Sequence, residues 1–184
     1  MTRTITDEQH DEAGDTQRTH GALRNAAFAG ASVAAAVAAG TAATAPGGAW
    51  YKGLDKPAWQ PPQAAFPIVW TSLYADIAVT SALVLNEFER RGEVKQAADY
   101  RHALSVNLTL NSAWSWVFFR WHNLPAATVG AGVLAASSWR LARLAGRARP
   151  AYGRLLAPYA GWTSFATVLA GTVWRKNPDL DWSH

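Results

Sequence analysis

The sequence predicts an all-α integral membrane protein, built as a bundle of five transmembrane helices. Ten tryptophans in 184 residues are the first indication, because several lie near the ends of long apolar runs. A bilayer favours an amphipathic ring at this headgroup depth. The second indication is the length of five apolar runs, each close to the roughly 20 helical residues that span a hydrocarbon core about 30 Å thick. The third is that basic residues form short clusters between these runs, which argues against nucleic-acid binding.

Polar tails flank the predicted bundle. Residues 1–20 hold almost no large apolar side chain but carry five of the thirteen acidic residues. Such a segment cannot bury enough surface to offset the entropy lost on ordering. We therefore expect a disordered N-terminal tail over 1–21, a transmembrane domain over 22–176 and a C-terminal tail over 177–184.

Each apolar run has features of a membrane helix. The first is rich in Ala, Val and Gly, and small residues let helices approach closely in lipid. The second and fourth runs begin with Pro67 and Pro125, where a missing N–H costs nothing. The fifth contains Pro158, which is tolerated where neighbouring helices satisfy the freed carbonyl. In order, the runs cover about 22–45, 66–86, 102–121, 125–144 and 152–174.

The basic clusters orient the bundle. The links after the second and fourth runs lie on the same side as the N-terminus. By the positive-inside rule this side is cytoplasmic. We expect a prokaryotic cell membrane, with the N-terminus in the cytoplasm and the first link outside. The residues that decide this orientation are Arg90, Arg91, Lys95, Arg101, Arg140, Arg143, Arg147, Arg149 and Arg154.

The long first link, 46–65, predicts a lid over the mouth of the bundle. Its prolines restrict the backbone, and its aromatic residues supply apolar surface. A connection of this length in a compact domain is usually functional or disordered. The alternative is an interfacial loop whose aromatic rings lie at headgroup depth. The residues concerned are Trp50, Tyr51, Pro57, Trp59, Pro61 and Pro62.

Polar and aromatic stripes on three runs predict a pocket inside the bundle. Asn107, Asn111 and Trp114 are spaced i, i+4, i+7 and share one helical face. Amides are costly in lipid, so this face points inward, either to line a pocket or to join helices through hydrogen bonds. Together with stripes on the second and fifth runs, it predicts a site for a flat hydrophobic ligand. Those two stripes are Trp70 with Tyr74, and Tyr159 with Trp162, Ala166 and Leu169.

The remaining polar residues of the apolar runs, Asp76 and two histidines, match no known catalytic motif and no metal site. Asp76 lies alone in the second run, about 240° around the helix from Trp70. We interpret it as a structural or interface residue that pairs with an arginine, contacts a second copy or stays protonated. His102 and His122 lie at opposite ends of the third run, too far apart to ligate one haem. With no cysteine, no HExxH motif and no phosphate-binding loop, no metal or cofactor is expected.

Five motifs lie along the chain: WY at Trp50–Tyr51, KPxWxPP at Lys56–Pro62, FPxxWxxLY at Phe66–Tyr74, Asn107 with Asn111, and PYxxWxxFATxL at Pro158–Leu169. Together they resemble the tryptophan-rich sensory protein / translocator protein family over about residues 22–177. The resemblance implies five transmembrane helices, usually a homodimer, and a pocket below the first loop for porphyrins and related hydrophobic ligands. It also implies roles in tetrapyrrole regulation, transport and stress response, with light-dependent porphyrin breakdown in some members.

The resemblance assigns roles to individual residues. Trp70 and Asn111 match positions that hydrogen-bond a ligand, and Trp162 matches the second pocket tryptophan. Trp70 and Trp162 are also the pair implicated in porphyrin degradation, so they are the catalytic residues if the protein is an enzyme. The remaining wall and lid positions are Tyr51, Pro61, Asn107, Trp114, Ala166 and Leu169.

Two positions depart from the family pattern. Members usually carry Asn or another polar or bulky residue where this chain has Ala170. The sterol-recognition pattern of animal members has a Tyr between Leu and Arg in the last run, where this chain has Val173 and Trp174. Cholesterol recognition of that type is therefore not expected.

Three functions follow as hypotheses. The leading one is a membrane protein that binds tetrapyrroles in a Trp-lined pocket as a sensor, regulator or carrier. The second is an enzyme that degrades protoporphyrin in light, with porphyrin as its substrate. The third is a transporter of small hydrophobic ligands, although no internal repeat or broken helix pair marks an alternating-access site. The expected partners are a flat hydrophobic ligand, the lipid bilayer and a second copy of the chain.

Overall fold

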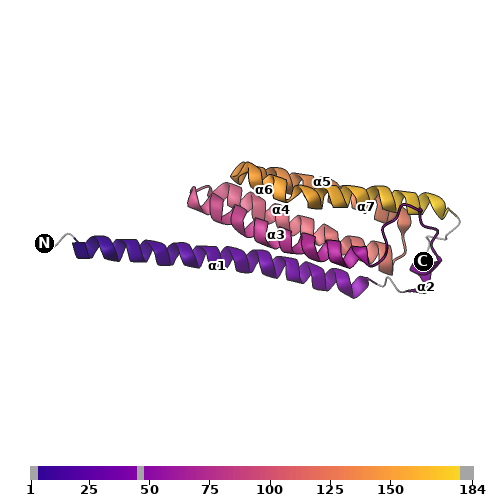
Figure 1. Cartoon of the computed structure of the whole chain (residues 1–184), viewed down its shortest axis with the longest axis horizontal. Coiled ribbons are helices and arrows are strands. Elements are labelled where there is room, and N and C mark those ends of the chain that lie inside the picture. The colour runs from indigo at the N-terminus through magenta and orange to yellow at the C-terminus, as the bar shows by residue number, and fades with distance from the viewer. Residues whose placement is uncertain (1–3, 45–47, 179–184) are drawn as a thin grey trace.

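The computed structural model describes residues 4–44 and 48–178, with side chains from Thr19 onward. Five long helices run roughly along the longest axis of the molecule (Figure 1). Within the described ranges helices joined by short turns and one longer link make up the chain, with no strand, so the predicted all-α fold is confirmed. The long helices are α1 (Thr4–Ala43), α3 (Ala65–Arg90), α4 (Val94–Ser115), α5 (Leu124–Ala148) and α7 (Ala157–Lys176). The shorter elements are α2 (Ala49–Gly53), the π-helical turn η1 (Trp116–Arg120) and α6 (Pro150–Leu155).

Two segments of the described chain are long and apolar enough to cross a membrane on length and composition alone: Thr19–Ala43 and Ala65–Arg90. The other long helices do not reach this mean hydropathy: α4 carries many amide, hydroxyl and charged side chains, and α5 and α7 are rich in alanine and glycine. They pack beside the two apolar segments in the same bundle (Figure 1).

Helix α1 corrects the expectation of a disordered tail over 1–21. It begins at Thr4, so residues 4–21 continue one helix of 40 residues. Extending an existing helix adds one hydrogen bond for each residue fixed, whereas starting a new one is costly. The polar segment therefore prolongs an apolar helix, and Figure 1 shows this part of α1 extending past the end of the bundle. Parts of three predicted segments (1–3, 46–47 and 179–184) lie outside the described residues.

Local sequence signals set the helix ends. After α3, Gly92 adopts φ +69°, which glycine tolerates without strain. The Glu93 N–H then donates to the Phe88 carbonyl at 2.8 Å, the hydrogen bond that closes a Schellman motif. At the start of α5, the Asn123 side chain accepts from the Ala126 N–H at 2.9 Å. These caps end α3 and begin α5 at defined residues and turn the chain back into the bundle.

The core lies between α3, α4, α5 and α7. Its largest fully buried side chains include Tyr100, Tyr159 and Phe88. A second cluster, around Leu54 and Phe118, packs the first link against η1 and α7. Large apolar side chains that point outward lie on several helices, as expected for surfaces in lipid: Ile68, Val79, Val129, Val133 and Val168.

Candidate ligand-binding cavity

A cavity of about 840 Å³ lies between the first link and the bundle, and its walls come from α1, α2, α3, α4, η1, α7 and the link itself. Clefts of this size suit small-molecule ligands. Most of the residues predicted to form a binding site come together here. Those that line the cavity are Tyr51, Trp70, Asn111, Trp114, Trp162, Ala166 and Leu169.

Pro61 and Asn107 are the two predicted site residues that do not line the cavity. The link meets the cavity through Gln60 and Gln63, on either side of Pro61. Asn107 lies one helical turn deeper than Asn111 and is fully buried. Tyr159 bonds to Asn107 at that depth, so the Asn107 amide joins helices.

A chain of hydrogen bonds forms the cavity floor. The Tyr74 hydroxyl donates to Asn111 Oδ1 at 2.7 Å, and Asn111 Nδ2 donates to the Tyr159 hydroxyl at 3.3 Å. Tyr159 donates in turn to Asn107 Oδ1 at 2.8 Å, and Asn107 Nδ2 donates to Ser138 Oγ at 3.1 Å. The chain links α3, α4, α7 and α5, and it fixes the orientation of both amides. The predicted inward direction of the Asn107–Asn111 stripe is confirmed.

The tryptophans differ in whether their indole N–H is satisfied. Trp114 donates to the Ala127 carbonyl at 2.9 Å, so its donor is already used. In the part of the chain that the structure describes, the indole N–H groups of Trp70 and Trp162 donate to no protein acceptor, and because no buried polar side-chain atom is left without a partner there, both N–H groups stay accessible to the cavity or to solvent. Packing nevertheless fixes their rings, with Trp70 stacked on Tyr74 at 5.4 Å between centroids and Trp162 edge-on to Phe66 at 5.9 Å. Two rigid cavity-lining donors are therefore free for a ligand.

The first link forms the outer wall. Tyr51 packs against Phe119 at 5.7 Å between ring centroids, and the Lys56 ammonium lies 4.7 Å from the centre of the Tyr51 ring. Gln60 Nε2 donates to the Tyr51 hydroxyl at 3.4 Å. Burial raises the pKa of Tyr51, so its hydroxyl stays neutral. The lining is thus rich in aromatic side chains, with one lysine at the outer wall.

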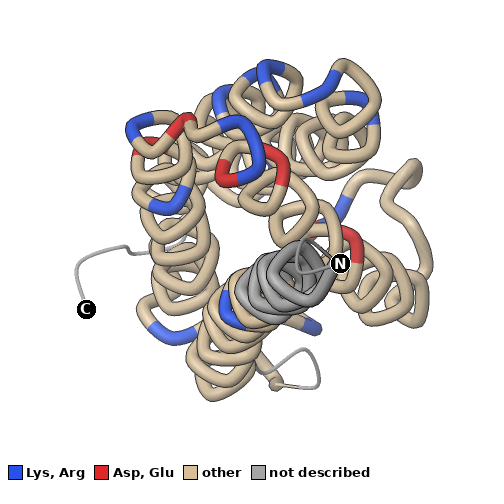
Figure 2. Tube along the Cα trace, turned by 90° about the vertical axis from the view of Figure 1, so that its left-hand side faces the viewer, with Lys and Arg blue, Asp and Glu red and all other residues tan. Residues whose placement is uncertain are grey.

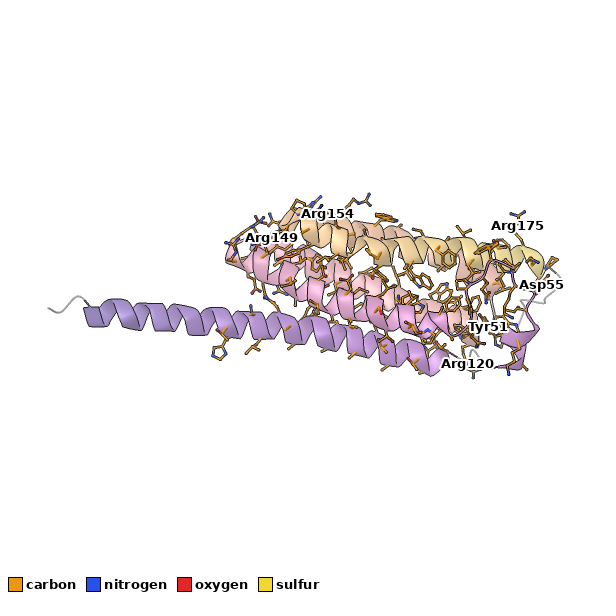
Figure 3. All side chains as sticks on the ribbon, in the orientation of Figure 1. Tyr51, Asp55, Arg120, Arg149, Arg154 and Arg175 are labelled. Atoms are coloured by element: carbon orange, nitrogen blue, oxygen red, sulfur yellow. The ribbon has the colours of Figure 1, made fainter. Side chains whose placement is uncertain are left out.

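Asn177, just after α7, ties the link to the bundle. The Asp55 N–H donates to Asn177 Oδ1 at 2.9 Å, and Asn177 Nδ2 donates to the Asp55 carbonyl at 2.9 Å. Asn177 Nδ2 also reaches the Val173 carbonyl at 2.7 Å, and Lys176 Nζ lies 3.2 Å from Asp55 Oδ2. We call these contacts the Asp55–Asn177 clasp. Figure 3 shows Asp55, Tyr51, Arg120 and Arg175 at this same end of the molecule.

With this geometry in place, comparison with known proteins decides the family. The TspO/MBR family model matches residues 27–175. The chain belongs to the TspO/MBR family. Its relatives include the Bacillus subtilis "uncharacterized membrane protein YtaB", 35% identical over 70% of this chain and 80% of that protein. Protein CrtK of Rhodobacter capsulatus is 32% identical (79% of this chain, 89% of CrtK), and human translocator protein is 34% identical (70% and 75%).

Membership of the TspO/MBR family and the apolar helices together make this an integral membrane protein. The matched region contains every cavity-lining residue. It begins after the polar first part of α1, so that part is an addition to the TspO/MBR core of this chain.

Sequence reasoning missed several lining residues of this TspO/MBR cavity. Phe118 continues the stripe of Asn111 and Trp114 by one more turn, a spacing that could have revealed it. Helix α1 also lines the cavity, at Val37 and Thr41. These side chains are small and form no polar or aromatic stripe, so they do not stand out in an Ala-rich run. Asp76 is not in the lining: it accepts from Thr80 of its own helix at 2.9 Å and forms no ion pair with any described residue.

Proposed function

We propose that this TspO/MBR protein binds tetrapyrroles, protoporphyrin or haem-like, in the cavity and acts as their sensor, regulator or carrier. A flat conjugated ring can stack on, or lie edge-on to, the aromatic side chains of α3, η1 and α7. Lys56 supplies a positive charge at the outer wall for the carboxylates of a porphyrin. The name translocator protein, borne by the human relative, supports the carrier form of the proposal.

The observation that carries the proposal is the pair of free indole donors at Trp70 and Trp162. These donors are accessible and are not used by the protein, so a ligand that brings an acceptor forms a hydrogen bond without displacing an internal one. Ring nitrogens and carboxylates of a tetrapyrrole supply such acceptors. Trp114, whose donor is used internally, contributes ring surface alone.

Titration of protoporphyrin in the dark tests this proposal. Trp70→Phe and Trp162→Phe each keep an aromatic ring and delete the donor. Each should weaken binding by about 1–3 kcal/mol, up to roughly a hundredfold in Kd. Trp139→Phe is the matched control, because its indole donates to Ser164 outside the cavity lining. Parental affinity in both cavity variants would show that ligand binds elsewhere.

The same two tryptophans favour a second function, light-dependent oxidative degradation of protoporphyrin by molecular oxygen. Indole is easily oxidised, and Trp70 and Trp162 would then be the catalytic residues. At saturating protoporphyrin, Trp162→Phe should slow the light-dependent loss of Soret absorbance strongly, while Trp139→Phe should not. A defined product by mass spectrometry supports an enzyme. An unchanged rate in the Trp70→Phe/Trp162→Phe double variant would mean ordinary photobleaching.

We further propose five membrane spans, a homodimer and a role in stress response. The orientation we propose has a cytoplasmic N-terminus and an external first link in a prokaryotic cell membrane. It is supported by the concentration of arginines at the end formed by the α3–α4 turn and the α5–α6 connection, seen end-on in Figure 2.

A further inference from the structure

Four exposed arginines lie where α5 meets α6, and we call them the arginine patch: Arg140, Arg143, Arg147 and Arg154. The first three are spaced i, i+3, i+7, so they share one face of α5. Helix α6 lies directly on α5, since a Cβ at Gly153 would come within 3.0 Å of the Gly146 Cα. Figure 2 shows basic residues spread over this end of the bundle, and Figure 3 places Arg154 at the end opposite Arg120 and Arg175.

The arginine patch is not neutralised by carboxylates. Other arginines at this end pair with two glutamates, one of which, Glu87, is only 5% exposed. Within residues 19–44 and 48–178, none of the four patch arginines forms an ion pair. The ion pairs of these two glutamates are Glu87 with Arg90, Arg91 and Arg149, and Glu89 with Arg24 and Arg101.

Asp99, on the facing helix α4, forms no ion pair with the patch. It bonds instead to Lys95 at 2.8 Å. This hydrogen bond is the main reason that the pKa of Asp99 lies below its usual value, and the charges of Arg140 and Arg147 lower it further. The exposed patch arginines therefore lie beside α4 without an ion-pair partner, because Asp99 of that helix is paired with Lys95.

The patch also lies at headgroup depth. At 1.5 Å per residue, Arg140 is about 24 Å along α5 from Leu124, and Arg147 about 35 Å. The hydrocarbon core is about 30 Å thick, so a helix that enters at Leu124 brings Arg147 to the opposite interface and Arg140 to within about 6 Å of it, a distance that a long arginine side chain spans by snorkelling. Trp139, beside Arg140, is 44% exposed, as expected for a ring in the aromatic belt of a membrane protein.

We propose that the arginine patch binds the headgroups of anionic phospholipids, on the membrane surface opposite the first link. A guanidinium presents a rigid fork that matches two phosphate oxygens, which an ammonium cannot do. Because the patch lacks internal carboxylates, a lipid phosphate need not displace a partner. The contact recruits anionic lipid to the α5–α6 connection and holds that end of the bundle at the interface.

Native mass spectrometry of the full chain, with phosphatidylglycerol and phosphatidylcholine added in neutral detergent, tests this proposal. The wild type should retain phosphatidylglycerol preferentially. Each arginine contributes roughly a fivefold factor near an anionic surface, so Arg140→Gln/Arg143→Gln should lower the preference about 25-fold. Arg120→Gln/Arg175→Gln removes two exposed charges at the opposite end and should leave the preference unchanged.

A lysine variant and two competing anions separate lipid binding from general attraction of negative charge. Arg140→Lys/Arg143→Lys keeps the charge but loses the fork, and it should retain part of the preference. Inorganic phosphate and a short DNA duplex, at matched charge concentration, should not displace the lipid. Equal losses in the two Gln variants, or displacement by phosphate or DNA, would overturn the proposal. If the patch variant does not fold, a wild-type preference that persists unchanged from low to high salt would overturn it instead.

Discussion

Replacing Asn177 by alanine should loosen the first link without touching the cavity. The substitution removes two hydrogen bonds to the Asp55 backbone, both of 2.9 Å, and one to the Val173 carbonyl. Only the first two cross from α7 to the link. At about 0.5–1.5 kcal/mol net for each bond, the clasp holds the link by about 1–3 kcal/mol. Opening of the link should therefore become roughly 5- to 150-fold more frequent in Asn177→Ala.

Hydrogen exchange measures this opening directly, because the Asp55 N–H is itself a donor in the clasp. Its exchange should accelerate by the same factor, and the dissociation rate of bound protoporphyrin should rise with it. Lys176→Gln is the control, since its ion pair with Asp55 joins side chains that are 41% and 62% exposed. Such exposed pairs contribute little, at about 0–1 kcal/mol. Unchanged exchange at Asp55 in Asn177→Ala would refute the clasp, whatever the ligand does.

Three further predictions test the hydrogen-bonded floor of the cavity, the polar first turns of α1 and the orientation of the protein in the membrane. Asn107→Ala leaves the Tyr159 hydroxyl without its acceptor, so it should destabilise the protein by about 1–3 kcal/mol in thermal or chemical unfolding; an unchanged stability would mean that Tyr159 finds another partner. Deleting residues 1–18 should leave Tm and protoporphyrin affinity nearly unchanged in detergent, because this part of α1 extends past the bundle; a large drop in Tm would contradict that. Asp55→Cys introduces the chain's one thiol, which an impermeant maleimide should label in intact cells; labelling only after lysis would reverse the proposed topology.

Helical periodicity predicted much of the cavity. The inward stripe of Asn107 and Asn111, and the faces of Trp70 and Trp162, follow from the 100° step between successive helical residues. Periodicity predicts which face of a helix a residue lies on, but it does not predict how deep in the bundle that residue lies. Asn107 and Asn111 share a face and both join helices, yet only Asn111 also lines the cavity, because Tyr159 from another helix bonds at the depth between them.

Two features could not be predicted from the sequence: a hydrogen-bonded pair far apart in the chain, and the extension of a helix into a polar segment. Asp55 and Asn177 lie 122 positions apart, and neither residue signals the other. The polar start of α1 lacks apolar side chains, so composition predicted disorder, while attachment to a stable helix settles its structure locally. Composition indicates how much apolar surface a segment can bury, but it does not show that the segment extends a stable helix.

The continuous helix α1 joins the polar start of the described chain to the cavity wall. Its far end lines the cavity through Val37, Gly40 and Thr41, while its first turns lie beyond the bundle. Between them Asn25 is buried and hydrogen-bonded to Asn86 and Glu89 of α3, which anchors α1 to α3. From Thr4 to Val37 is about 50 Å of helix without a hinge. Beyond Asn25 the helix is also held to α4 and η1, because Ser112 Oγ donates to the Ala36 carbonyl and Trp116 Nε1 to the Ala39 carbonyl, both at 3.0 Å. The polar first turns and the α1 wall of the cavity therefore belong to one helix that is fixed to its neighbours from Asn25 to Ala39.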